Sequence, residues 1–338
     1  MHHAFRTIGT RASRVRGVAA ASAVLTAVLA TVNAGPSSPA TRAHTATRSA
    51  HPILGVLGDP GRFDPQTGQK SRARLLIVGW GQGGTPAYFA SLFATMSDEP
   101  MLGLSTGQAG AETISPGQIA RGAGDDYLAA INQAIAQWGK PVFVRPLAEM
   151  NGYWNAYSAY EKSGSPRDAD HSTAAFRRAF ARIYVLLHGG AVNGRLASLG
   201  LPPAHVRVAK NPFVKVIWNP QGYGDPDLAG NSAQAYYPGD RYVDIVGDDL
   251  YDIGGRAAWP AADALYQAHP GKPFAFPEWG LWNLDDPAFI SQMAAFVADH
   301  PRTILVSYYS GAPGSIFDLA SKPRSLAAYR HLIAPLGR

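Results

Sequence analysis

Short apolar runs rich in β-branched residues alternate with amphipathic helical segments from Ile53 onward, and this alternation limits the possible folds more than any other feature. Several of the runs are apolar throughout, as is typical of parallel strands whose two faces are both covered. The predicted strands are Ile53–Leu57, Leu75–Trp80, Met101–Thr106, Val142–Leu147, Lys215–Asn219, Val243–Val246, Phe274–Pro277 and Ile304–Tyr308. The clearest predicted helices are Pro86–Met96, Asp125–Trp138, Thr173–His188, Ala261–His269, Pro287–His300 and Ser325–Ile333.

Strands and helices in near-regular alternation over residues 53–338 predict an α/β protein with a (β/α)8 TIM barrel as its single catalytic domain. The rival is a doubly wound open sheet, but no glycine-rich dinucleotide fingerprint follows the first predicted strand. Gly81, Gly83 and Gly84 do follow the second. We interpret them as turn glycines, because no acidic residue suited to bind a ribose lies about 20 residues further on.

The first residues have the pattern of a secretory signal. Arg6, Arg11, Arg14 and Arg16 precede an apolar run at 18–32, and small residues ending at Ala34 follow it. The run is shorter than the roughly 20 residues that span a bilayer. We therefore expect a signal peptide over 1–34, a disordered Pro/Ser/Thr-rich spacer over 35–52, and a secreted, extracellular protein without a membrane partner after cleavage. The alternatives are an uncleaved anchor and a mistaken start codon.

Charge and cysteine content exclude several functions. The formal net charge is +6, but four arginines and no acidic residue lie in 1–34, which leaves an excess of only +2 beyond them. That excess does not indicate a nucleic-acid partner. The absence of cysteine excludes a disulfide scaffold and a cysteine nucleophile. Asp248 and Asp249 lack further ligands at regular spacing, so we do not expect a metal site. We also expect that the protein needs no cofactor and that it is a monomer.

Two of the predicted strands end in glutamate and continue into aromatic residues. PVFVRPLAE ends at Glu149 and leads to Trp154, and PFAFPE ends at Glu278 and leads to Trp279 and Trp282. A barrel gathers its chemistry where strands end. One such glutamate is easily explained as an exposed or salt-bridged carboxylate. Two at the same face, on the fourth and seventh strands and both followed by tryptophan, favour a catalytic pair.

Glycoside hydrolysis requires such a pair, because one carboxylic acid protonates the leaving oxygen while a second carboxylate attacks or activates water. Aromatic faces stack on the C–H faces of sugars, so we expect Trp154, Trp279 and Trp282 to contact or support the substrate. Sugar hydroxyls require several placed donors and acceptors. Polar candidates near the strand ends are Asn151, Asn155, Asn219, Gln221, Asp248 and Asp249.

Two further residues are expected to support Glu278. Arg145 lies four residues before Glu149, and side chains at even spacing on a strand share a face, so both can point into the barrel. An arginine there can hold a carboxylate ionised, although a structural arginine that bridges barrel layers is an equal and compatible interpretation. Tyr251 closes the sixth strand segment and can donate its hydroxyl to Glu278, or else form part of the wall.

A set of motifs resembles glycoside hydrolase family 26, which is typified by retaining (β/α)8 β-mannanases. The motifs are RPLAEMNG at 145–152 with Trp154, WNP at 218–220, YPGD at 237–240, YVD at 242–244 with Tyr251, and PEWG at 277–280. The resemblance implies that Glu149 is the acid/base and Glu278 the nucleophile. It also implies supporting roles for Arg145, Trp154 and Tyr251.

The chain departs from the family pattern at two places. The family usually has histidine immediately before the acid/base, where this chain has Ala148. It also tends to have a tryptophan at the end of the eighth strand as a sugar platform, where this chain has Tyr308 and Tyr309. We therefore expect Tyr308 to take part in stacking, over less area than a tryptophan.

These patterns together predict a secreted retaining endo-glycosidase that uses double displacement on a β-linked polysaccharide, with β-1,4-mannan as the first candidate. The alternatives in the same class are a β-1,3-xylanase and a mixed-linkage β-glucanase. The alternative in a different class is a carbohydrate-binding barrel with weak or no catalysis, which Ala148 keeps open.

Overall fold

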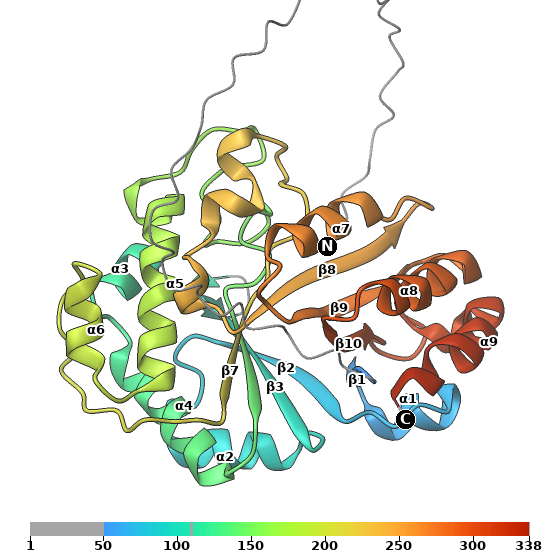
Figure 1. Ribbon diagram of the computed structural model, residues 1–338, viewed down its shortest axis with the longest axis horizontal. Helices are drawn as coiled ribbons and strands as arrows, with labels where there is room; N and C mark the ends of the chain where they lie inside the picture. Colours follow the sequence, from blue (N-terminus) through green and yellow to red (C-terminus); the bar gives the residue numbers. More distant parts are fainter. Residues whose placement is uncertain (1–50, 109–110, 338) are drawn as a thin grey trace, which may run out of the picture. The chain divides into compact units, whose positions relative to one another are not determined.

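Eight parallel strands form a closed ring in the computed structural model, which describes residues 51–108 and 111–337 (Figure 1). Around the ring they follow the order β1-β10-β9-β8-β7-β6-β3-β2. Their bounds are β1 (Ile53–Leu57), β2 (Ala73–Gly79), β3 (Glu99–Ser105), β6 (Val142–Pro146), β7 (Val214–Trp218), β8 (Ile245–Ile253), β9 (Phe274–Trp282) and β10 (Thr303–Tyr309). Because β1 pairs with both β2 and β10, the ring closes and has no open edge. The predicted (β/α)8 barrel is confirmed.

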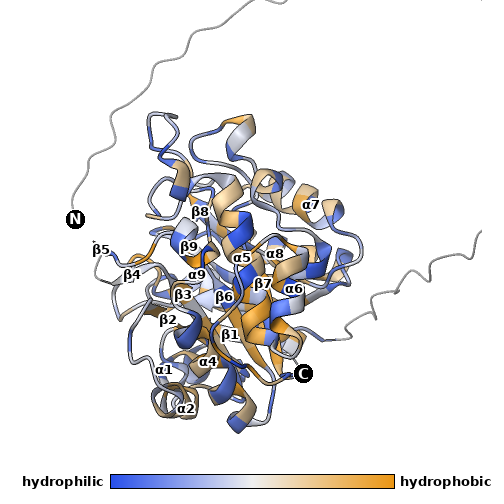
Figure 2. Cartoon of the chain, turned by 90° about the vertical axis from the view of Figure 1, so that its left-hand side faces the viewer, coloured by the Kyte–Doolittle hydropathy of each residue, from blue (hydrophilic) through white to orange (hydrophobic). Residues whose placement is uncertain are grey.

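Helices surround the strands. The hydropathy colouring shows that the strands are mostly apolar, whereas the outer helices carry both polar and apolar residues (Figure 2). The helices are α1 (Pro60–Thr67), α2 (Pro86–Ala94), α3 (Pro116–Ala120), α4 (Asp125–Trp138), α5 (Thr173–His188), α6 (Val192–Ser198), α7 (Trp259–Ala268), α8 (Pro287–Asp299) and α9 (Pro323–Leu332). A two-stranded hairpin, β4 (Gly107–Gln108) with β5 (Ala111–Glu112), follows β3. A short 3-10 helix, η1 (Ala169–His171), precedes α5.

Each predicted strand and each predicted helix corresponds to an observed element, but β8 and β9 run further than the apolar runs indicated. They continue to pair beyond Asp249 and Glu278 as far as Ile253 and Trp282. Glu278 therefore lies inside a strand rather than after it. Helices α1, α3 and α6 were not among the predicted helices; α1 is eight residues long and contains a proline, Pro65, which is uncommon inside a helix.

Inside the ring, side chains form layers because alternate residues of each strand face the axis. The layer at the N-terminal ends of the strands is apolar and consists of Ala73, Leu75, Met101, Phe143, Ile217, Ile245, Ala275 and Leu305. Two residues beyond Phe143, in the next layer of the same strand, lies Arg145, of which only 3% is exposed. The barrel thus changes from apolar to charged toward the C-terminal ends of its strands.

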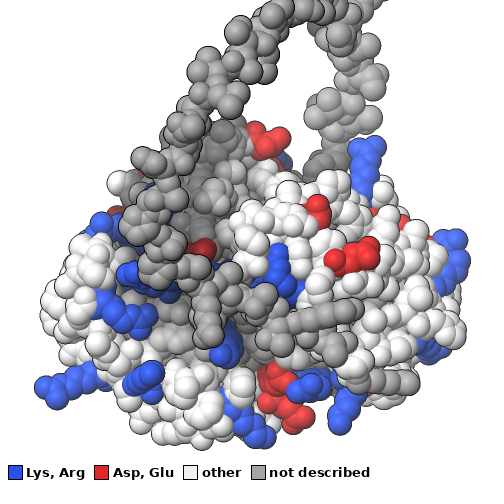
Figure 3. Space-filling model, viewed as in Figure 1, with Lys and Arg blue, Asp and Glu red and all other residues white. Residues whose placement is uncertain are grey.

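The two ends of the described chain meet at the N-terminal end of the barrel. The ring of His51 lies 3.2 Å from the carbonyl oxygen of Leu336, and the 3-10 helix Ala334–Gly337 packs against β1. The predicted signal peptide and residues 35–50 of the predicted spacer lie outside the described residues. Among the helices described between residues 51 and 337, none is long and apolar enough to cross a membrane. On the face shown in Figure 3, lysine and arginine side chains are scattered rather than gathered into one patch.

Candidate active site

Arg145 is the centre of a charged cluster at the C-terminal ends of four consecutive barrel strands. From β6 its Nε donates to Oδ1 of Asn219 at 2.9 Å, at the end of β7. Its two terminal nitrogens form ion pairs with Asp249 on β8 and Glu278 on β9. Burial alone would lower the pKa of Arg145, but the surrounding carboxylates raise it above its usual range. Arg145 is therefore a fixed cation that orients side chains from the next three strands.

Glu278 is held through both of its carboxylate oxygens. Oε1 pairs with Arg145, and Oε2 accepts a hydrogen bond of 2.8 Å from the hydroxyl of Tyr251. Burial and the negative charge of Glu278 raise the pKa of Tyr251 well above its usual range, so Tyr251 stays protonated as a donor. Glu278 is 9% exposed and so remains accessible from the open end of the barrel. This arrangement suits an ionised carboxylate with a fixed orientation.

Asp249 was considered from sequence only as a poor metal ligand and as a possible partner for hydroxyl groups. Its Oδ2 instead pairs with Arg145, and its Oδ1 is buried without a hydrogen-bond partner among the described residues. It lies opposite Glu278 in the β8–β9 register. The signal that could have identified it is this pairing, because cross-strand neighbours share a face.

Glu149 follows β6 and receives one hydrogen bond on each carboxylate oxygen. Nε2 of Gln221 donates to Oε1 at 2.8 Å, and Nε1 of Trp154 donates to Oε2 at 2.8 Å. The backbone nitrogen of Glu149 donates to the carbonyl of Asn219, which ties it to the end of β7. Glu149 therefore lies at the same end of the barrel as Glu278, as the sequence predicted.

Asn151 supports the site without offering a free polar group to a ligand. Its Nδ2 donates to the carbonyls of Gln221 and Tyr223, and its Oδ1 accepts from the backbone nitrogen of Gln221. The side chain is completely buried. It thus fixes the loop after β7, from which Gln221 reaches Glu149.

Exposed aromatic side chains flank the two glutamates. Trp154, which bonds Glu149, is 45% exposed, and Trp282 at the end of β9 is 42% exposed. The ring of Trp282 contacts Tyr251 and Phe317, and Phe317 stacks on Tyr309 with ring centroids 4.3 Å apart. Phe317 was not identified from sequence, because it lies in an irregular loop after β10. This loop is tied to the end of β9 by a hydrogen bond from the backbone nitrogen of Asn283 to the carbonyl of Ile316.

Trp279 and Tyr308 are not placed on a sugar-binding surface, in contrast to the expectation from sequence. Both are completely buried between the ring of strands and the outer helices. Trp279 stacks on Tyr329 of α9, and Tyr308 stacks on Phe63 of α1. The physical reason is the alternation of side chains along a strand: Glu278 faces the axis, so Trp279 faces outward. Tyr309, rather than Tyr308, belongs to the aromatic wall.

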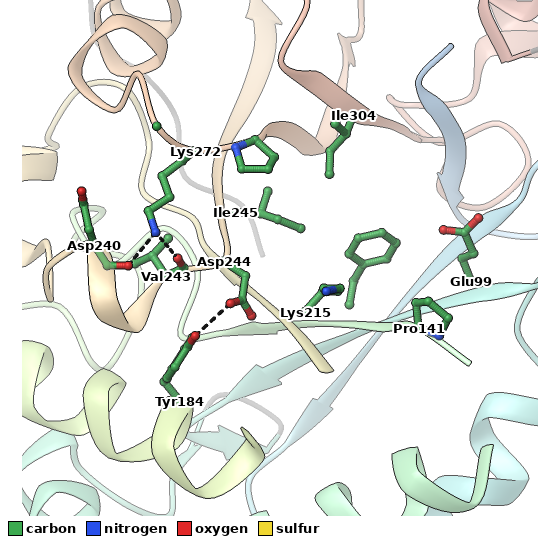
Figure 4. A pocket seen from close by; sticks show the side chains of 13 residues that line it. Glu99, Pro141, Tyr184, Lys215, Asp240, Val243, Asp244, Ile245, Lys272 and Ile304 are labelled. Carbon is green, nitrogen blue, oxygen red and sulfur yellow. Dashed lines mark hydrogen bonds between the residues drawn. The ribbon is translucent and has the colours of Figure 1, made fainter. Parts of the chain in front are cut away.

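A pocket of about 510 Å³ lies at the opposite end of the barrel, where the strands begin (Figure 4). Several of its polar side chains are hydrogen-bonded or ion-paired within the fold. Asp244 accepts one hydrogen bond from Tyr184 and pairs with His188, and Nζ of Lys272 donates to the carbonyls of Asp240 and Val243. These contacts hold together the end of the barrel where the strands begin, and this end is separate from the two glutamates.

Comparison with known proteins finds similarity to a mannosidase and to an endoglucanase. No family model matches the chain. It is 27% identical over 183 residues to the mannan endo-1,4-beta-mannosidase of Bacillus subtilis, an alignment that covers 51% of this chain and 40% of that protein. It is 24% identical over 234 residues to endoglucanase H of Acetivibrio thermocellus, which covers 64% of this chain and 22% of that protein. The chain thus spans less than half the length of these two relatives.

Solved structures share the whole barrel at low sequence identity. The Bacillus subtilis mannanase BCman superposes with a TM-score of 0.54 and 19% identity, covering 86% of this chain and 88% of that one. A modular endo-beta-1,4-mannanase of glycoside hydrolase family 26 from Cellulomonas fimi gives a TM-score of 0.52 and 16% identity, covering 87% and 75%. The chain therefore has the (β/α)8 fold of the family 26 glycoside hydrolases, and its resemblance to that family is confirmed.

Proposed function

We propose that the chain is a retaining glycoside hydrolase that cleaves β-1,4-linked mannan within the polysaccharide chain. The observation that carries the proposal is the pair of glutamates at one end of the barrel: Glu278 is paired with Arg145 and hydrogen-bonded by Tyr251, and Glu149 is bonded by Gln221 and Trp154. The names of the mannanase relatives support mannan as the substrate.

In the first step a carboxylate oxygen of Glu278 attacks the anomeric carbon, while Glu149 donates its proton to the glycosidic oxygen that leaves. This forms a covalent glycosyl-enzyme and releases the shortened chain. In the second step Glu149, now ionised, takes a proton from water, and the water oxygen displaces Glu278 from the anomeric carbon. Two inversions restore the β configuration, and both glutamates return to their initial protonation states.

The exposed aromatic residues support action inside a long chain. Trp154 lies beside Glu149 and would stack on the sugar of the leaving group, whereas Trp282 with Tyr251 and Phe317 lies on the side of Glu278 and would stack on the glycone. Aromatic platforms on both sides of the two glutamates would accommodate a polysaccharide that extends in both directions.

A mixed-linkage or other β-glucan is the second candidate substrate. Ala148 stands where the resembled family usually has a histidine that contacts the sugar, so one polar contact to mannose is missing. Similarity to an endoglucanase also favours this candidate.

Hydrolysis of a panel of dyed polysaccharides tests the proposal: β-mannan, β-1,3-xylan and mixed-linkage β-glucan, with a pull-down on the same solids. We expect the fastest release of dye from mannan. NMR of the first products should show β anomers, because double displacement retains configuration. Binding to the solids without hydrolysis of any of them, or α products, would contradict the proposal.

A further inference from the structure

The backbone that leads from β6 to Glu149 has an unusual conformation. Leu147 has φ +50° and Glu149 has φ +53°, and both carry side chains that disfavour this left-handed region. Such residues persist only where the surrounding structure determines the backbone, and they cluster at functional sites. The group that aims the Glu149 side chain is therefore a strained segment of three residues, Leu147–Glu149.

This segment is attached to the strands on both sides of β6. The backbone nitrogen of Leu147 donates to the carbonyl of Leu104 at 2.8 Å, and that of Glu149 donates to the carbonyl of Asn219 at 2.7 Å. The first bond reaches β3 and the second the end of β7. Ala148 lies between these two anchored residues, so its peptide group decides how the segment is turned.

The carbonyl oxygen of Ala148 accepts two hydrogen bonds from side chains. The hydroxyl of Tyr157 donates at 2.6 Å and Nδ2 of Asn155 donates at 3.3 Å. The same amide also donates to the carbonyl of Glu149 at 2.9 Å. Tyr157 is only 5% exposed, and burial together with the charge of Glu149 raises its pKa above the usual range. Its hydroxyl thus remains a proton donor at any working pH.

Arg167 fixes the loop that carries both donors. Its Nη1 donates to the carbonyls of Asn155 at 2.9 Å and Ala156 at 2.5 Å, and its Nη2 donates to the carbonyl of Tyr153 at 2.9 Å. Because these carbonyls flank Trp154 as well, one guanidinium group orders the loop on the leaving-group side of the site.

We propose that Tyr157 and Asn155 are positioning residues for Glu149. By binding the Ala148 carbonyl they keep Leu147 and Glu149, on either side of it, in their left-handed conformations. The inference rests on the proposed function, in which Glu149 is the proton donor. Nδ2 of Asn155 donates both of its hydrogen bonds to backbone carbonyls, so this group serves the acid/base rather than the hydroxyls of the sugar. Tyr157 acts in the same way through its hydroxyl.

The test uses Tyr157→Phe, which removes the hydroxyl and keeps the buried ring. kcat/KM is measured on phenyl and 2,4-dinitrophenyl β-disaccharides of the sugar that the parent cleaves, mannobiosides in the first instance. A phenol is a poor leaving group that needs a well-placed proton donor, whereas dinitrophenolate leaves without one. We expect a loss of about 10- to 100-fold on the phenyl substrate and less than about threefold on the dinitrophenyl substrate.

Two further variants separate positioning from general destabilisation. In a Glu149→Ala background, Tyr157→Phe should cause no additional loss on the phenyl substrate, because the residue that it positions is absent. Tyr184→Phe is the matched control: it removes a tyrosine hydrogen bond to Asp244 at the opposite end of the barrel, and the ratio of the two activities should equal that of the parent. Asn155→Ala, which removes the donor without adding a charge, provides the same measurement if Tyr157→Phe does not fold.

Equal losses on both substrates, or a loss that adds fully to that of Glu149→Ala, would overturn the positioning role. If Glu149→Ala loses more activity on the phenyl substrate while Tyr157→Phe and Asn155→Ala do not, the inference fails and the proposed function stands. If Glu149→Ala lowers both activities equally, Glu149 is not the proton donor, and the proposed function and the inference fail together.

Discussion

The hydroxyl of Tyr251 donates to Glu278 from the neighbouring strand, two residues beyond Asp249, which lies opposite Glu278 in the sheet register. Side chains two residues apart on a strand share a face. β8 therefore places a carboxylate that holds Arg145 and a phenol that binds Glu278 on the same side, and Glu278 has one donor for each oxygen before any substrate arrives.

Tyr251→Phe should lower kcat by about 10- to 100-fold, because one of the two donors that hold Glu278 ionised and oriented is lost. KM should change little, since the aromatic ring remains. Steady-state kinetics on mannan measure both. Tyr329→Phe, which removes a buried hydroxyl from Gln69 on the outer layer, is the control and should retain parental kcat. Equal effects of the two substitutions would show that Tyr251 has only a structural role.

The two glutamates should differ in their response to azide. Glu149→Ala should still form the glycosyl-enzyme from an activated aryl glycoside and then stall, and azide should restore turnover and yield a β-glycosyl azide. Glu278→Ala should lose activity by several orders of magnitude, and azide in the vacated space should yield the α anomer. NMR of the products identifies the anomers. Opposite anomers would reverse the two roles, and full activity of both variants would exclude this pair.

His171 should stabilise the fold at acidic pH only. Its ring bonds Glu112 of β5 at 2.7 Å and Asp168 before η1 at 2.7 Å. Burial alone would lower the pKa of His171, but these two carboxylates raise it above 6.5. The stabilisation is therefore present below about pH 6.5 and is lost as the pH rises through the higher folded-state value. His171→Gln should lower the free energy of unfolding by roughly 1 kcal/mol at pH 5.5 and hardly at pH 9, as measured by urea denaturation. A deficit independent of pH would contradict this.

Asp248 should also make the stability of the parent fall as the pH rises. Burial raises its pKa from 3.8 to about 8, against the hydrogen bond that its Oδ1 accepts from the Gly222 backbone. The unfolded chain loses this proton at lower pH than the folded one, so the parent loses stability as the pH rises from about 4 to about 8. Relative to the parent, Asp248→Asn should gain up to about 1.4 kcal/mol per pH unit over that range. Denaturation curves at pH 4, 6 and 8 measure the difference, and parallel pH profiles for the two proteins would count against it.

Export should remove the first residues. The basic segment up to Arg16, the apolar run at 18–32 and Ala34 predict cleavage before Gly35. Mass spectrometry of the protein from culture medium should find an N-terminus at or near Gly35. Recovery of the intact chain from Met1 in the cytosol alone would refute the prediction.

The alternation of apolar runs was sufficient to predict the ring, because each strand that is covered on both faces needs such a run. Because such a run is apolar on both faces, its composition does not indicate which side chains point toward the barrel axis and which point outward. Trp279 and Tyr308 were expected near the sugar and instead pack outward, although the period of two counted from Glu278 already assigns Trp279 to the outer face. The left-handed backbone at Leu147 and Glu149 had no signal at all, since neither residue is one that favours that conformation.

His51 and Leu336, near the two ends of the described chain, are in contact, so a second protein could be joined to both ends at one place on the barrel. Both ends of the described chain leave the ring at the pole where the strands begin, and the glutamates lie at the other pole. A protein with this geometry can be spliced as a cassette into a surface loop of a host protein, because the ring stays unbroken when its two ends are tethered side by side. The host would then be attached at the end away from Glu149 and Glu278, so the end that carries the two glutamates would stay accessible.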